Sequence, residues 1–137
     1  MDIKTYSSKQ VLISLGSHSV EGPADGDFLS IEPNSEGFTR VVGAYGEVVR
    51  SVSPDETYTL ALTLLMQSPT VAWCQNQFDR DRATGDGMFP ILVKDMKGGI
   101  IFSAEQAWIV NSPAVTYGIE ASTREITIHT GAGTYRY

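Results

Sequence analysis

The chain has 137 residues, enough for one domain with its own core, and 16 acidic against 10 basic residues give a net charge of −6. An acidic chain of this kind repels nucleic acid rather than binding it. The single cysteine excludes an intrachain disulfide and favours assembly in the cytosol. No apolar run approaches the roughly 20 residues of a membrane span, so no membrane anchor is expected.

The first part of the chain predicts short strands joined by glycine-containing turns. Residues 1–10 are polar and predict an extended N-terminal arm. Residues 11–15, followed by Gly16 and Ser17, predict a hairpin. The next strand is expected at 28–32. A second hairpin is expected from 38–43 and 47–52, which flank a turn at Ala44, Tyr45 and Gly46.

The clearest element covers residues 57–67, where large apolar and small side chains alternate. This alternation is typical of a strand with one apolar face. Burial of the large side chains, at about 1.5–3 kcal/mol each, would make the strand a core anchor. The opposite face is uncharged, which suits close packing against a neighbour or the smooth wall of a channel. The apolar face comprises Tyr58, Leu60, Leu62, Leu64 and Met66, and the other face comprises Thr57, Thr59, Ala61 and Thr63.

One amphipathic α-helix is predicted over residues 69–84. Ser68 is a suitable N-cap, and Pro69 takes the first helical position, where its missing N–H costs nothing. Gly85 is a plausible stop. An apolar stripe, which predicts packing on the β core, is formed by Val71, Cys74 and Phe78.

The C-terminal third predicts further strands. Residues 88–93 are continuously apolar, which predicts a strand buried on both faces, although Pro90 favours an edge or a bulge there. Residues 100–109 fit a helix or a strand by pattern, and we favour a strand because the hairpin needs a partner. No linker divides residues 1–137, so one domain is expected. The last strands are expected at 115–118 and 124–130, and residues 131–137 are expected to form a loose tail.

No catalytic or metal-binding constellation is visible, so neither an enzyme nor a cofactor is expected. His18 and His129 have no acid or cysteine at ligand spacing. Trp73 and Trp108 leave open a β-sandwich binding module with a sugar platform, although packing is their commoner role. Strands that are apolar on both sides, such as 38–43 and 47–52, favour association with a partner.

Several segments, taken in order, resemble the tail tube proteins of contractile-tailed, myovirus-type bacteriophages. Together they span most of residues 11–130. Each is a turn or strand pattern, so the specificity comes from the ordered set. The segments are ADGDFLSIEPNSEGFTRVVGAYGEVVRS (24–51), TLALTLLMQSP (59–69), the pattern of Asp81 followed by TGDGMFPILVKDMKG (81–98), SAEQAWI (103–109) and STREITI (122–128).

The resemblance implies a β-sandwich or barrel-like tail-tube fold with one helix. It further implies hexameric rings that stack into a hollow tube inside a contractile sheath, through which DNA passes without specific binding. The implied partners are further copies, the tail sheath protein, and baseplate and tail terminator proteins. The implied location is the virion tail, after assembly in the host cytoplasm. A terminator that caps the tube with the same fold is the alternative.

Two sets of residues follow as hypotheses for the assembled tube. The lumen wall would take the uncharged strand face and part of the acidic segment before it. The inter-subunit contacts would come from the second hairpin and the charged end of the helix. The wall set is Thr57, Thr59, Ala61, Thr63, Asp25, Asp27 and Glu32; the contact set is Phe38, Arg40, Tyr45, Glu47, Arg50, Asp79, Arg80, Asp81 and Arg82.

Overall fold

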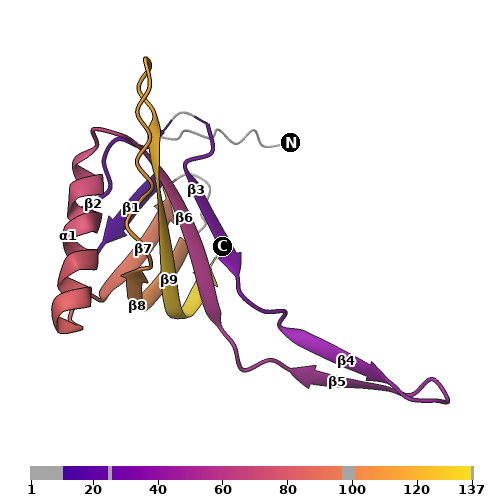
Figure 1. Ribbon diagram of the computed structural model, residues 1–137. Coiled ribbons are helices and arrows are strands. Elements are labelled where there is room, and N and C mark those ends of the chain that lie inside the picture. Colours follow the sequence, from indigo (N-terminus) through magenta and orange to yellow (C-terminus); the bar gives the residue numbers. More distant parts are fainter. Residues whose placement is uncertain (1–10, 25, 97–100, 137) are drawn as a thin grey trace.

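The computed structural model describes residues 11–24, 26–96 and 101–136, so the expected N-terminal arm and Asp25 lie outside the described residues. The mainly β class is confirmed, with one helix among these described residues (Figure 1). The elements are β1 (Val11–Leu15), β2 (His18–Ser19), β3 (Leu29–Pro33), β4 (Phe38–Val42), β5 (Val48–Val52), β6 (Thr57–Leu65), α1 (Pro69–Thr84), β7 (Phe89–Asp95), β8 (Ile101–Ile109) and β9 (Thr123–Arg136).

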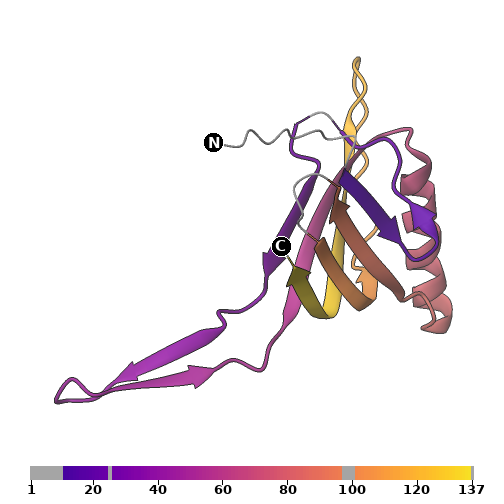
Figure 2. The same cartoon turned by 180° about the vertical axis from the view of Figure 1, so that it is seen from behind.

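Seven of the strands form one antiparallel sheet in the order β2-β1-β7-β8-β9-β6-β3, while β4 and β5 form a separate two-stranded sheet and pair with no other strand of the described residues. The large sheet is strongly curved, and α1 packs along one side of it (Figures 1 and 2). Register shifts between Phe89 and Ile91, and between Thr57 and Thr59, mark two irregularities in the ladder. Because bulges increase local twist, they help this sheet to curl into a barrel-like shape.

The core lies on one face of the curved sheet and is anchored by β6, as its alternation predicts. Leu60, Leu62 and Leu64 are fully buried. Leu60 and Leu62 lie directly opposite Ile128 and Ile126 of β9. Met66 falls beyond the end of the strand, in the turn before α1, and is only half-buried. β8 adds the fully buried Phe102 to the same cluster.

The helix begins and ends where the sequence predicts. The Ser68 side chain accepts a hydrogen bond from the Thr70 N–H at 3.2 Å, and Gly85 closes the helix in the left-handed region with φ 73°. Cys74 is fully buried, while Val71 and Phe78 of the same stripe are partly buried against the core. The stripe therefore holds α1 on the sheet.

Two predictions for the C-terminal third are wrong. Residues 131–136 are not a tail, because β9 continues to Arg136 and pairs with β8 along that stretch. Residues 115–118 are not a strand, because they lie in a protruding connection between β8 and β9 where no partner strand is available (Figure 1). The alternation in β9 that buries Ile126 and Ile128 is confirmed.

The β7 prediction is half right. A ladder irregularity does occur at Pro90, as proline predicts. The strand is buried on one face only, with Phe89, Ile91 and Val93 toward the core. Leu92 on the other face is 42% exposed, because only one side of the sheet is covered by α1 and the rest of the core.

Candidate assembly surfaces

The sheet face opposite the core carries small and polar side chains. On β6 it presents the predicted wall residues Thr59, Ala61 and Thr63. Thr59 lies between Glu32 of β3 and His129 of β9, and Thr63 lies opposite Glu125 of β9. The structure therefore places Glu32 beside the threonine face. Asp27 is exposed in the loop before β3, at the far end of that strand from Glu32.

A hydrogen-bond network joins this face to the neck of the second hairpin. Asn34 donates to the Thr57 hydroxyl at 2.9 Å and accepts from the Thr59 hydroxyl at 2.5 Å. Ser35 and Thr57 each donate to the Asp55 carboxylate at 2.6 Å. These bonds stabilise the ionised form, with Ser35 the largest cause, and lower the pKa of Asp55 to about 2. These hydrogen bonds hold the side chains of Thr57 and Thr59 in place. Ala61 and Thr63 lie outside this network and form the small, uncharged part of the face.

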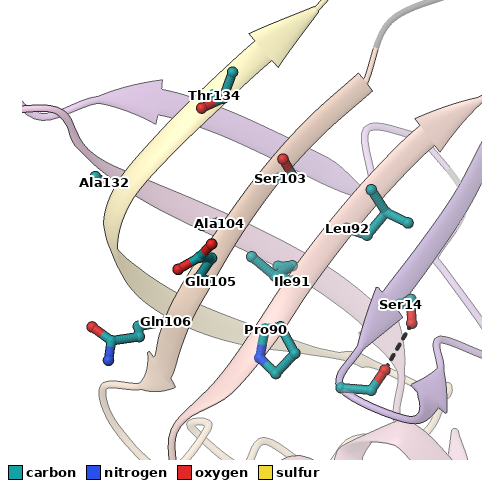
Figure 3. Close-up of a pocket in the computed structure, with 11 residues that line it drawn as sticks. Ser14, Pro90, Ile91, Leu92, Ser103, Ala104, Glu105, Gln106, Ala132 and Thr134 are labelled. Atoms are coloured by element: carbon teal, nitrogen blue, oxygen red, sulfur yellow. Dashed lines mark hydrogen bonds between the residues drawn. The ribbon is translucent and has the colours of Figure 1, made fainter.

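The same face continues across β9, β8, β7 and β1 as an open trough of about 640 Å³. Figure 3 shows Ser103 of β8 beside Thr134 of β9, with Leu92 of β7 further across the sheet. Glu105 is the charged side chain of this trough. Such a lining of small hydroxyl and apolar groups offers a surface for contact or passage, and no pair of groups for acid–base chemistry.

The hairpin β4–β5 projects away from the body of the protein (Figures 1 and 2). Every residue of both strands is exposed, including the apolar Val41 and Val49. The Arg50 guanidinium lies 4.4 Å from the centre of the Phe38 ring. Tyr45 at the tip is 93% exposed. The predicted contact residues of this hairpin therefore all lie on a surface that the other described residues leave uncovered.

The charged end of α1 lies on the other side of the molecule from this hairpin (Figure 1). Arg80 forms an ion pair with Asp86 at 3.2 Å. Asp79 accepts a hydrogen bond from Gln75, and Asp81 accepts one from the Gly87 N–H. The two predicted groups of contact residues do not meet within one chain, so any contact between them would have to form across copies. Arg82 is exposed on the last turn of the same helix.

A second protrusion was not predicted from the sequence. Residues 111–122, which we call the finger, rise from the sheet between β8 and β9 (Figure 1). Val115, Tyr117 and Ile119 are exposed there. Arg124 at the base is 5% exposed, and its guanidinium donates to the Ser122 hydroxyl at 2.9 Å. In the sequence this segment alternates Val115, Tyr117 and Ile119 with smaller or polar residues, a pattern that also predicts a strand, so the pattern alone did not reveal a protrusion.

Comparison with known proteins gives a sequence relative and a shared fold. No family model matches. The chain is 27% identical, over a 141-residue alignment, to "Structural protein ORF10" of Pseudomonas phage KPP10, covering 97% of this chain and 82% of that protein.

Solved structures of contractile injection systems have the same fold. The sheath/tube terminator of an extracellular contractile injection system (PVC) matches with a TM-score of 0.68 at 10% identity, over 97% of both chains. The tube-terminating cap of the anti-feeding prophage matches at 0.60 and 11% identity, over 99% of this chain and 93% of that one. A chain of the PVC sheath-tube complex matches at 0.62 and 10% identity, over 96% and 91%. The resemblance to contractile-tail proteins is confirmed.

Within this contractile-tail fold, the two tryptophans do not form a common platform. Trp73 of α1 packs edge-on against Phe89 on the core side, with ring centres 5.2 Å apart, and stacks on His18 at 5.1 Å. Trp108 of β8 neighbours His129 on the opposite face of the sheet. The sheet therefore separates the two rings that the sugar-binding alternative requires together.

The side chains of Cys74 and His18 both take part in packing the helix α1 against the rest of the fold. Burial raises the pKa of the Cys74 thiol to about 12, so the predicted buried cysteine is confirmed. The His18 ring lies 2.9 Å from the Thr70 hydroxyl, which ties the first hairpin to the start of α1. The helix of the described residues, α1, has 16 residues and a charged second half. It is neither long enough nor apolar enough to span a membrane.

Proposed function

We propose that the chain is a structural subunit of a contractile phage tail, and that copies of it form hexameric rings that stack into the inner tube. The observation that carries this proposal is the uncovered hairpin β4–β5, with exposed apolar side chains on both of its faces. An isolated two-stranded hairpin is marginally stable in water, and a large exposed apolar patch marks a protein contact. We take a neighbouring copy of the chain as the partner, because the solved structures with this fold come from sheath and tube assemblies.

The uncharged part of the sheet face, at Ala61 and Thr63, is suited to lining a channel through which DNA passes without binding. Ala61 and Thr63 carry no charge, and the charged neighbours on their face, Glu32 and Glu125, are acidic. An acidic, small-residue patch repels phosphates, so DNA would slide along it. The basic residues of the same sheet face, Lys94 and Arg136, lie away from this patch, in a row that crosses β7, β8 and β9. The sheath protein would surround the tube, and baseplate and terminator proteins would contact its two ends, in the virion tail.

Electron microscopy of the purified protein tests this function. The wild-type chain is expected to give tubes or stacked rings. The matched variant replaces residues 38–52 with a short Gly-Ser linker and is expected to remain monomeric with an unchanged melting temperature, because the hairpin adds no buried residue to the core. Wild-type protein that stays a small globular particle, or a hairpin-free variant that still forms tubes, would contradict the proposal.

A tube-terminating role is the second candidate. It is favoured by the similarity to the anti-feeding prophage cap and to the PVC sheath/tube terminator. A terminator closes one ring and stops, whereas a tube subunit adds ring upon ring. The same micrographs separate the two roles: single closed rings that bind only tube ends identify a terminator.

A further inference from the structure

One face of the hairpin β4–β5 carries two arginines between apolar pairs. Arg40 lies directly opposite Arg50, with the pair Phe38 and Val52 on one side. Because cross-strand partners share a face, the two guanidiniums point from the same side of the hairpin. The pair Val42 and Val48 flanks them on the other side.

This arginine pair is not neutralised within the described residues. Like charges directly opposite each other destabilise a hairpin. Glu36 lines a shallow surface hollow together with Arg40 and Arg50, but it forms no ion pair with either arginine. The one ion pair found in the described part of the chain joins Arg80 of α1 to Asp86. The hairpin therefore presents a site suited to a carboxylate flanked by apolar side chains.

The finger carries a matching group. Glu120 is exposed next to the fully exposed Ile119 and close in sequence to the exposed Tyr117. Glu120 has no hydrogen-bond or ion-pair partner among the described residues. It is the one charged residue of the finger, whereas the hairpin from Phe38 to Val52 has two basic residues and one acid. The two protrusions thus have opposite net charge and similar apolar character.

The base of the finger is preorganised for such a contact. The Arg124 guanidinium lies under the Tyr117 ring, 5.4 Å from its centre, and donates to the Ser122 hydroxyl. Ser122 in turn donates to the Thr116 carbonyl at 2.8 Å. A protruding loop that is fixed at its base loses less conformational entropy when it docks.

We propose that the finger of one copy docks on the hairpin of another, with the Glu120 carboxylate between Arg40 and Arg50. The finger and the hairpin project from opposite ends of the molecule (Figures 1 and 2), so the contact forms only between copies. Two different, complementary surfaces at opposite ends make a head-to-tail interface, which propagates into rings or stacks. This inference rests on the proposed function and names the surfaces that carry it.

Mixed cysteine variants test the contact. Glu120→Cys and Arg50→Cys are prepared separately, mixed, assembled and oxidised. A disulfide-linked dimer is expected from the mixture and from neither variant alone, because each cysteine meets the other only across copies. Cys74 is buried and does not compete. The matched control, Glu21→Cys mixed with Arg50→Cys, is expected to give no dimer.

Charge reversal provides a second readout if the cysteines impair assembly. Glu120→Arg alone and Arg50→Glu alone are each expected to lose assembly with unchanged melting temperatures, and the double variant is expected to regain it. Glu21→Arg should assemble like the wild type. Wild-type tubes together with no cross-link, or a Glu120→Arg protein that assembles normally, would overturn the contact and leave the proposed function standing. A wild-type chain that never assembles would remove both.

Discussion

At the scale of single residues, Gly133 shows how closely β9 passes over the aromatic part of the core. Tyr58, Phe102 and Tyr135 form a cluster with ring centres 5.1–5.3 Å apart. A Cβ at position 133 would lie 2.8 Å from both the Phe102 and the Tyr58 rings. The glycine therefore lets the end of β9 lie flat on these rings, and it is a packing requirement rather than a sign of a loose tail.

Gly133→Ala is expected to destabilise the folded subunit by about 1–3 kcal/mol, because the rings must move to admit the methyl group. Urea unfolding of the monomer measures this change. Gly131→Ala is the matched control, since the nearest atom to its Cβ is 3.8 Å away. Equal stability of the two variants would show that the rings yield without cost.

Cys74 is expected to be unreactive in the native protein. Burial raises the pKa of its thiol from 9.0 to about 12, which lowers the thiolate fraction at pH 8 roughly a thousandfold. A thiol reagent should therefore modify unfolded protein rapidly and native protein at least about a hundredfold more slowly. Rapid native modification at pH 8 would mean that α1 opens easily from the sheet.

At the scale of elements, local patterns predicted the strands and the helix where side-chain period or capping is strong. The Leu/Thr alternation identified β6, and Ser68 with Pro69 identified the start of α1. The extension of β9 was missed because Gly131 and Gly133 lower strand propensity, and the need for Gly133 arises from rings distant in sequence. The apolar run in the finger suggested a strand, but strand formation requires a partner that only the tertiary structure determines.

The neck of the hairpin is expected to respond to acid. Hydrogen bonds from Ser35 and Thr57 lower the pKa of Asp55 from 3.8 to about 2. A lowered pKa means that the ionised carboxylate stabilises the neck above pH 3.8, and that this support is lost as the pH falls through about 2. The carboxyl NMR shift of Asp55 should therefore titrate near pH 2 in the wild type and at a higher pH in Ser35→Ala combined with Thr57→Val, which removes both hydroxyl donors but keeps the Thr57 N–H bond to the carboxylate at 2.9 Å. A wild-type midpoint near 4 would show that the network is open in solution.

At the scale of the whole molecule, the surfaces proposed for assembly lie far apart on one chain. The wall face, the hairpin, the finger and the end of α1 point in different directions (Figures 1 and 2). Glu32 and Thr59, which the sequence assigned to one wall, lie directly opposite each other on paired strands, while their place in a lumen stays a prediction. It could not predict which exposed side chains meet across copies, because that depends on the direction in which each protrusion leaves the sheet.

Lysine on the proposed wall should impair DNA passage without unfolding the subunit. Thr63→Lys and Thr59→Lys each place a cation on the face opposite the core, where it would bind phosphates inside a tube. We expect an unchanged melting temperature for Thr63→Lys and a small decrease for Thr59→Lys, which loses the hydrogen bond to Asn34. Both variants should assemble, with DNA release slowed and the slowing relieved by added salt. Asn76→Lys on the exposed side of α1 is the matched control. Normal DNA release by both wall variants would remove this face from the lumen.

The uncovered hairpin also has a kinetic consequence. Among the described residues no other strand pairs with β4 or β5, so we expect the hairpin to be only marginally ordered in a free subunit. The first contacts between copies would then include the entropic cost of ordering it. If the chain forms rings as proposed, the ordered hairpins of a finished ring would be templates for the next copy, which would then bind over a lower barrier. Spontaneous nucleation would then be slow, and growth from an existing ring would be fast. Elongation would therefore begin mainly where another structure provides the first ring.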